Sequence, residues 1–370
     1  MSGADTTPLA RELAARIARD GPISVAAYID ACLQHPEHGY YRRQAAIGTA
    51  ADFITAPEIS QVFGEIIGLW CAVVWQQLGS PARVRLVELG PGRGTLMGDA
   101  LRASRLVPAF RAALRVELVE SSTTLEAAQR AALANEAVPL TWSRELAPGG
   151  EPAIVVANEF LDTLAVEQWV FRGGTWRTRC IDCTAGGALS FADGRPPLCA
   201  DVPAGLAAPA EGSIFETRGA AFATLTAKLA AVGMPVAGLF IDYGHASPGY
   251  GDTLQAVSKH GYADPLARPG EADLTAQVDF AGFAAAVRGA GLVCDGPVPQ
   301  AEFLGRLGVL ERGSRLMAAN PGQAAAIEAA IARLMAPVGM GTRFQAIGIR
   351  SPDLAPLPAL TPVDTAHRTP

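Results

Sequence analysis

Lysine is nearly absent from this chain, since Lys228 and Lys259 are the only two among its 30 basic residues. The net charge is −6, so the sequence lacks the basic surplus that neutralises phosphates, and we expect no nucleic acid partner. No apolar run reaches membrane-spanning length, which excludes membrane insertion. The N-terminal stretch contains Asp5 and Glu12 and has no apolar signal core, so we expect no secretory signal.

The sequence also lacks a recognisable metal-ligand set. Cys180 and Cys183 form a Cys-x-x-Cys, but no second pair and no histidine cluster lies near them. We therefore expect no bound metal. The scattered thiols are typical of a reducing compartment, and we expect a cytoplasmic protein of a bacterium.

The stretch Val84–Met97, VRLVELGPGRGTLM, organises the rest of the chain. Its first six residues predict a buried parallel strand, and a helix opens near Thr95. Between them stand Gly90, Gly92 and Gly94, which allow a sharp turn and a close approach of the backbone to a ligand. Free N–H groups at the start of the helix add donors for that ligand. Strand, turn and helix together predict the ligand site of a doubly wound α/β fold.

Small differences between this glycine turn and known nucleotide-binding motifs indicate the class of ligand. The dinucleotide fingerprint requires a third glycine, but Thr95 or Met97 stands at that position, and no Gly-Lys-Ser/Thr follows to make a P-loop. The pattern Glu-x-Gly-x-Gly-x-Gly, from Glu88 to Gly94, resembles motif I of the Rossmann-like S-adenosylmethionine methyltransferases. We therefore expect S-adenosyl-L-methionine as the cofactor.

Further strands follow, at 114–119, 139–142, 153–157, 236–242, 292–293 and 343–349, alternating with helices. This alternation predicts a Rossmann-like, seven-stranded α/β fold. Glu120 ends the second strand, where a carboxylate holds the ribose diol of a cofactor at a solvent-lined rim; a helix-start charge is the alternative. Ser121 and Asn158 also stand at strand ends, and we expect both to bind the cofactor.

The predicted domain organisation follows from these elements. We expect an N-terminal helical region with a lid-like loop (1–80), the first half of the methyltransferase core (81–165), and an insertion of hairpins, linker and helix (166–235). The second half of the core (236–350) and a proline-rich tail (351–370) complete the chain.

Two carboxylates follow the fourth main strand. Glu159 and Asp162 are three residues apart and, on a helix, would share a face on which to hold a guanidinium. Helix capping plus one surface acid is the alternative. Asp242 and His245, in DYGH at the end of the fifth main strand, are expected near the substrate. His245 and His260 are candidate acid–base groups, although lone loop histidines are more often structural.

A long loop rich in aromatic residues, glycine and proline precedes the helix that begins at Gln61. Ordered loops of this length usually bind a ligand or close over one. We therefore expect Tyr40, Phe53, Thr55 and Glu58 to contact the substrate or to form a lid.

Longer blocks of the sequence resemble one methyltransferase family more closely than the glycine turn alone does. They are GYY at 39–41, DFITAPEISQVFGE at 52–65, ELGPGRGTLM, NEFLDTL, DYGH, GDTLQAVSKH, GEADLTAQVDF, EFLGRLG and MGTRFQAIGI. In this order they resemble the MidA-type methyltransferases, which are complex I assembly factors of the mitochondrial matrix with many bacterial relatives. The resemblance covers most of the chain. Two positions depart from the family: Ala56 stands where serine is usual, and an acid at position 167 is not a family feature, which favours Glu159 and Asp162 as the pair.

The resemblance implies symmetric dimethylation of an arginine on a core subunit of respiratory complex I, and so a protein substrate. Two alternatives stay open at this point. One is an assembly chaperone that keeps the cofactor fold without catalysis, and the other is a small-molecule methyltransferase. The oligomeric state is also open, and a homo-oligomer is compatible with the sequence.

Overall fold

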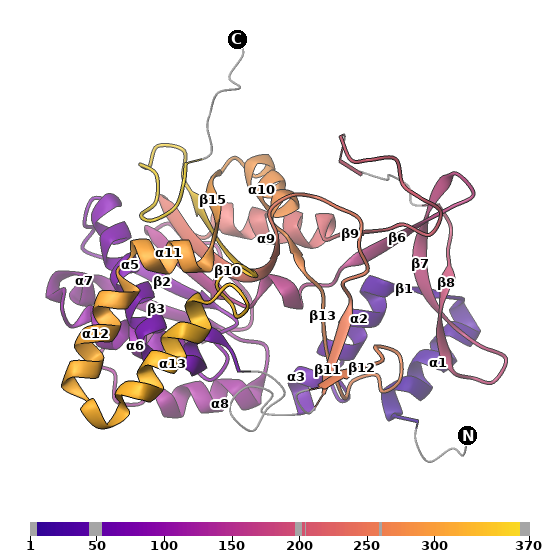
Figure 1. Cartoon of the computed structure of the whole chain (residues 1–370), viewed down its shortest axis with the longest axis horizontal. Helices are drawn as coiled ribbons and strands as arrows, with labels where there is room; N and C mark the ends of the chain where they lie inside the picture. Colours follow the sequence, from indigo (N-terminus) through magenta and orange to yellow (C-terminus); the bar gives the residue numbers. More distant parts are fainter. Residues whose placement is uncertain (1–5, 44–53, 197–201, 204, 259–260, 363–370) are drawn as a thin grey trace, which may run out of the picture.

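The computed structural model describes residues 6–43, 54–196, 202–203, 205–258 and 261–362. A large central sheet occupies one part of the elongated molecule, and a smaller antiparallel sheet occupies the other (Figure 1). In spatial order the central sheet contains β15 (Val293–Pro299), β16 (Phe344–Arg350), β10 (Val236–His245), β5 (Ala153–Asn158), β2 (Val84–Leu89), β3 (Leu114–Val119) and β4 (Leu140–Ser143). The short β14 (Val278–Asp279) pairs with the end of β10.

The strand order of the central sheet sets the position of a ligand site. β10, β5, β2, β3 and β4 are parallel, and β16 runs antiparallel to both of its neighbours. The chain passes from β2 to β3 on one side and later returns to β5 on the other. Ligands of open α/β sheets bind where the order reverses in this way. The predicted Rossmann-like α/β fold is confirmed.

Helices cover both faces of this sheet. One face carries α5 (Gln61–Gln77), α6 (Thr95–Ser104), α7 (Pro108–Ala113), α11 (Gln300–Arg306), α12 (Val309–Ala319) and α13 (Ala324–Met335); the other carries α9 (Gly219–Ala231) and α10 (Phe280–Gly289). Strand β10 has apolar side chains on both faces of the sheet. Leu239 and Ile241 belong to the hydrophobic cluster under the helices of the first face, and Val236 and Phe240 belong to the cluster under the helices of the second. Because side chains alternate along a strand, a parallel strand covered on both sides is apolar throughout.

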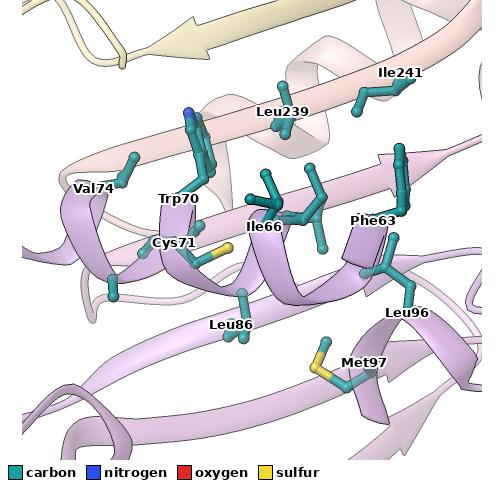
Figure 2. Packing of buried hydrophobic residues seen from close by; sticks show 14 of the residues in the cluster. Phe63, Ile66, Trp70, Cys71, Val74, Leu86, Leu96, Met97, Leu239 and Ile241 are labelled. Atoms are coloured by element: carbon teal, nitrogen blue, oxygen red, sulfur yellow. The ribbon is translucent and has the colours of Figure 1, made fainter. Parts of the chain in front are cut away.

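Helix α5 has 12 buried residues, and the side chain of Ser60 caps its N-terminus. Figure 2 shows its Phe63, Ile66 and Trp70 pointing at residues of the sheet. It packs tightly on α6, because a Cβ atom at Gly68 would lie 2.6 Å from the Cα atom of Ala100. The helix therefore fixes the position of α6, whose first turn borders the predicted cofactor site.

A smaller unit lies beside the central sheet, on the right of Figure 1. Its antiparallel sheet contains β1 (Ile23–Ser24), β7 (Thr175–Cys183), β6 (Glu167–Arg172) and β9 (Ile214–Thr217), with β8 (Leu189–Asp193) paired to β7. Helices α1 (Pro8–Asp20) and α2 (Val25–Gln34) share an apolar cluster with this sheet. The predicted hairpins are present. The sequence predicts that the helix of the insertion spans 215–232, but residues 215–217 belong to β9 and α9 begins at Gly219. The domain boundaries stay predictions.

Three shorter strands, β11 (Gln255–Ser258), β12 (Gly261–Ala263) and β13 (Asp273–Thr275), form a third sheet that the sequence did not predict. The remaining short elements are α3 (Tyr40–Arg43), α4 (Ala56–Ile59), α8 (Thr123–Ala132), η1 (Leu161–Thr163) and η2 (Pro321–Gln323). The described part of the proline-rich tail is docked, since the indole of Trp70 donates to the Pro358 carbonyl at 3.0 Å. No helix in the described ranges is long and apolar enough to cross a membrane.

Candidate active site

The predicted glycine turn lies between β2 and α6. Gly90, Gly92 and Gly94 all have positive φ, at +63°, +55° and +85°, and Gly94 is the cap residue of α6. A side chain at any of these positions would strain the backbone. At Gly90 a Cβ atom would also lie 3.0 Å from the ring of Phe160. The turn therefore exposes bare backbone to the neighbouring cavity.

That cavity has a volume of about 560 Å³. Gly90 and Gly92 line it beside the ends of β2 and β3, so it lies at the point where the strand order reverses. Glu120 and Ser121, which the sequence predicts to bind the cofactor, line it as well. Its other walls are mainly apolar and include Leu89, Val119, Leu125, Leu146, Phe160, Leu164 and Leu225. A cavity of this size and lining suits a nucleoside-containing ligand.

Glu120 is more deeply buried than the solvent-lined rim that the sequence indicated, with 8% of its surface exposed. Its Oε1 accepts a 2.7 Å hydrogen bond from the Ser122 backbone N–H, and its Oε2 accepts one of 3.1 Å from the Gln129 amide. Gln129 also donates to the Gly92 carbonyl at 2.7 Å. Glu120 thus ties α8 to the glycine turn while it lines the cavity.

Two buried acceptor atoms lie close to the same turn. Oε2 of Glu88 and Oδ1 of Asn158 have no hydrogen-bond partner among the described residues. Burial, followed by the charge of Glu120, raises the pKa of Glu88 to about 8. Both residues line a small cavity of about 50 Å³ with Gly90 and Thr95. A ligand ammonium would satisfy these acceptors and favour the charged carboxylate, so the residues present fit the amino acid end of S-adenosylmethionine.

Helix α4 contributes Pro57 and Glu58 to the wall of the small cavity. The hydroxyl of Thr95, the first residue of α6, donates to Oε1 of Glu58. Thr55, the cap residue of α4, lines the cavity without a side-chain capping bond of its own. The sequence-predicted residues Thr55 and Glu58 thus stand next to the predicted cofactor site.

Glu159 follows β5 directly and has a positive φ of +51°, which is uncommon for a residue other than glycine. Its backbone N–H donates to the Ile241 carbonyl at 2.8 Å, which holds the turn. Its Oε1 accepts hydrogen bonds of 3.1 Å from the Ala56 backbone N–H and from the Asn158 amide. Burial, and then the charge of Asp162, raises the pKa of Glu159 to about 7. The strained turn therefore presents a carboxyl group that is easily protonated.

Asp162 lies in η1, and its carboxylate contacts two elements from later in the chain. Oδ2 accepts a 2.5 Å bond from the Tyr243 hydroxyl and a 3.0 Å bond from the Thr275 hydroxyl, and Oδ1 is buried without a partner in the described ranges. Asp242 is fully buried and accepts the Asp162 backbone N–H at 3.1 Å. Burial raises the pKa of both aspartates, most strongly at Asp242, where the charges of Asp162 and Glu159 add to it. The fold thus assembles a cluster of three acids.

Sequence reasoning missed three members of this site. Tyr243 and Thr275 bind Asp162, and the buried Arg218 donates to the backbone carbonyls of Leu164, Gln277, Ala276 and Asp162. Arg218 also supplies positive charge close to Asp162 and Asp242. Tyr243 and Thr275 lie within the DYGH and GEADLTAQVDF blocks, which were the available signals. No sequence signal pointed to Arg218.

Other predicted site residues lie elsewhere. Tyr40 is buried in the apolar cluster of the smaller unit with 1% of its surface exposed, whereas its neighbour Tyr41 lines the 560 Å³ cavity. The ring of His245 lies 2.7 Å from the Ser247 carbonyl, and His245 lines neither the 560 Å³ nor the 50 Å³ cavity. Phe53 and His260 lie outside the described residues. Among the described residues, no three His, Cys, Asp or Glu side chains are grouped to hold a metal ion.

A third cavity, of about 860 Å³, lies between β10, the β11–β13 sheet and the turn that follows α13. Glu159 lines this cavity as well as the 560 Å³ and 50 Å³ cavities. Tyr243 and Thr275 line only the largest of the three, which we name the acceptor groove. Glu159 therefore stands where two ligands would meet.

The comparisons with known proteins agree on one family. Residues 66–298 match the family described as "Putative S-adenosyl-L-methionine-dependent methyltransferase". The chain is 36% identical to "Protein arginine methyltransferase NDUFAF7 homolog, mitochondrial" of Drosophila melanogaster, over 91% of this chain and 83% of the relative. It is 34% identical to the Homo sapiens protein of that type, over 91% and 82%. A crystal structure from Burkholderia thailandensis with bound S-adenosyl-homocysteine superposes with a TM-score of 0.85 at 29% identity and covers 97% of both chains.

Proposed function

Because this chain belongs to the S-adenosyl-L-methionine-dependent methyltransferase family, we propose that it transfers the methyl group of that cofactor to an arginine side chain of a protein. The single observation that carries the proposal is the position of Glu159. This carboxyl group lines the predicted cofactor cavities on one side and the acceptor groove on the other. A carboxyl group that can pair with a cationic acceptor therefore stands between the cofactor cavities and the acceptor groove.

The cofactor half of the site follows from the contacts above. Glu88 and Asn158 offer buried acceptors to the ammonium group, and Glu120 offers a carboxylate to the ribose hydroxyls. When bound, S-adenosylmethionine supplies an electrophilic methyl group on its sulfonium. The bare glycine turn lets the ligand approach the backbone, and the apolar wall around Phe160 excludes water.

The acceptor half of the site requires negative charge. A guanidinium is protonated at neutral pH, so the enzyme has to bind a cation, orient one nitrogen and remove a proton during transfer. Glu159 and Asp162 can pair with the guanidinium, and Glu159, with a pKa of about 7, is suited to accept the proton. Tyr243 and Thr275 hold Oδ2 of Asp162, so that Oδ1 stays available.

The finer proposal concerns the substrate. The Drosophila and human relatives are named "Protein arginine methyltransferase", which supports a protein acceptor. The sequence blocks that resemble MidA-type proteins support a core subunit of respiratory complex I, with symmetric dimethylation of one arginine that assists assembly. We propose the same role for this chain, in the cytoplasm of a bacterium.

One experiment tests the reaction. Complex I purified from cells that lack this protein is incubated with the purified chain and methyl-labelled S-adenosylmethionine, and the labelled residue is identified by mass spectrometry. We expect symmetric dimethylarginine on one core subunit, and less label by roughly a hundredfold or more with Glu159→Gln. Label on a residue other than arginine would contradict the proposal. Normal assembly of complex I in cells that carry Glu159→Gln, without methylation, would instead favour an assembly chaperone.

A further inference from the structure

We propose that the acceptor groove binds an extended peptide segment that carries an acidic residue near the target arginine, with Arg333 and Arg343 as the residues that select it. The inference rests on the proposed function and adds a sequence preference to it. It follows from the charges of the groove, from their lack of partners and from the way in which the groove reaches Glu159.

The groove lies between parts of the chain that are distant in sequence. Its lining residues come from β11, β12 and β13 on one side and from the turn between α13 and β16 on the other. Tyr262 of β12 and Val338 of the turn are 82% and 88% exposed, which is unusual for large apolar side chains. A volume of about 860 Å³ exceeds what one arginine side chain fills, so several residues of a segment can enter.

The charges inside the groove have a simple arrangement. Among its described lining residues, Glu159 is the only acid, and Arg333 and Arg343 are the only basic residues. Neither arginine side chain forms an ion pair or a hydrogen bond with any described residue. Both arginines stand at exposed positions of the groove, whereas the half-buried Arg312 binds Glu65 at 2.7 Å. As far as the described residues go, the two groove arginines are therefore available to pair with a ligand that enters the groove.

Arg333 is close enough to Glu159 for its charge to lower the pKa of that carboxyl group, against the larger effect of burial. A target guanidinium at Glu159 would therefore meet a second positive charge nearby. An unbalanced like charge in a partly desolvated site disfavours binding. A carboxylate of the same peptide, paired with Arg333 or Arg343, removes this penalty, because arginine and carboxylate form bidentate hydrogen bonds. The groove thus favours a segment with one target arginine and an acid beside it.

Peptide methylation tests the preference directly. The probes are synthetic 15-residue peptides with one central arginine in a serine-glycine background, with aspartate, asparagine or lysine placed at each flanking position in turn. The values of kcat and KM are measured with labelled S-adenosylmethionine for the wild type, for Arg333→Gln/Arg343→Gln and for Arg333→Glu/Arg343→Glu. Arg315→Gln is the matched control, because Arg315 is an exposed arginine of α12 outside the groove.

We expect at least one flanking position where aspartate raises kcat/KM about tenfold over asparagine, chiefly through KM, since a rim ion pair acts on binding. The ratio should fall to about one in the double glutamine variant and persist in Arg315→Gln. In the double glutamate variant, lysine should become the preferred flanking residue. Equal rates for all flanks, or a preference that persists in the double glutamine variant, would overturn the inference while leaving arginine methylation standing. If no arginine peptide were methylated although the cofactor bound, the arginine assignment itself would fail, and this inference with it.

Discussion

The hydroxyl of Tyr243 lies 2.5 Å from Oδ2 of Asp162, although 81 residues separate the two in the chain. Thr275 adds a second hydroxyl to the same oxygen at 3.0 Å. One oxygen of the carboxylate is thus fixed by strands β10 and β13, and the other remains without a partner among the described residues. A carboxylate oriented in this way can meet a planar guanidinium with little loss of freedom.

The first prediction concerns Tyr243→Phe. Loss of a hydrogen bond to a charged group costs about 1.5–3 kcal/mol, so methyl transfer should slow by about tenfold to a hundredfold in kcat. The Tyr243 hydroxyl also lowers the pKa of Asp162, so the variant should need a higher pH for full activity. Cofactor affinity should not change. Tyr250→Phe is the control, because its hydroxyl binds the Ala207 carbonyl away from the groove. If Tyr243→Phe left kcat and its pH dependence unchanged, the Tyr243 hydroxyl would have no role in methyl transfer.

Much of the site could be predicted from the sequence because its signals are local. The glycine turn from Glu88 to Gly94 is set by neighbouring residues, and acids at the ends of parallel strands reach one edge by topology. The contact between Asp162 and Thr275 could not be predicted, because β13 belongs to a small sheet of short strands without a clear alternation. The strain at Glu159 was also hidden, because the sequence left open whether a helix follows β5, and the structure has a turn held by the Ile241 carbonyl.

The second prediction concerns Gly92→Val. At φ +55° a branched side chain is strained, and it would enter the space that the cofactor needs. We expect S-adenosylmethionine binding to be lost in calorimetry, and NAD not to bind either form. Gly174→Val is the matched control, because its φ is +80° but no atom of the described residues beyond its chain neighbours lies within 4 Å of its added Cβ atom. If the control lost cofactor binding equally, backbone strain alone would explain the effect.

The third prediction concerns Glu120→Gln. The ribose contact requires acceptors, and the amide of the variant presents donors to both the ligand and Gln129. Cofactor affinity should fall by about 1–3 kcal/mol. Stability should fall too, because Glu120 is buried and holds Ser122 and Gln129. A 2′-deoxy analogue of S-adenosylhomocysteine should bind the wild type more weakly but lose little further in the variant. If the loss of affinity caused by the 2′-deoxy analogue and the loss caused by Glu120→Gln were additive, Glu120 would not contact the ribose directly.

The fourth prediction concerns Glu88→Gln. The folded pKa of about 8 lies above the ordinary value of 4.5, so native Glu88 keeps a proton that the unfolded chain releases. Its contribution to stability is full below pH 4.5 and is lost as the pH rises through 8. Without cofactor, Glu88→Gln should therefore be more stable than the wild type at pH 8, by about 1–3 kcal/mol, and bind S-adenosylmethionine more weakly. Glu328→Gln, on the exposed face of α13, should change neither property. If Glu88→Gln were less stable than the wild type at pH 8, Glu88 would not be protonated in the folded protein at that pH.

The last prediction concerns the pH dependence of Glu159. Burial and Asp162 raise the pKa of this carboxyl group to about 7, so below that pH it is protonated and cannot pair with a guanidinium. In the wild type, kcat/KM for an arginine substrate should therefore rise tenfold per pH unit below 7 and level off above it. Glu159→Gln should bind the cofactor almost normally, lose roughly a hundredfold or more in methyl transfer, and lack this pH step.

The pH dependence of folding stability tests the pKa of Glu159 independently of the kinetics. Because the folded pKa is raised, the contribution of Glu159 is present below pH 4.5 and disappears as the pH passes 7, so Glu159→Gln should flatten this part of the unfolding profile. Agreement between the pH of the kinetic step and that of the stability change would assign both to one carboxyl group. If the kinetic step remained in Glu159→Gln, the titrating group would be Asp162 or Asp242, whose pKa values are also raised by burial, and Glu159 would act only in binding.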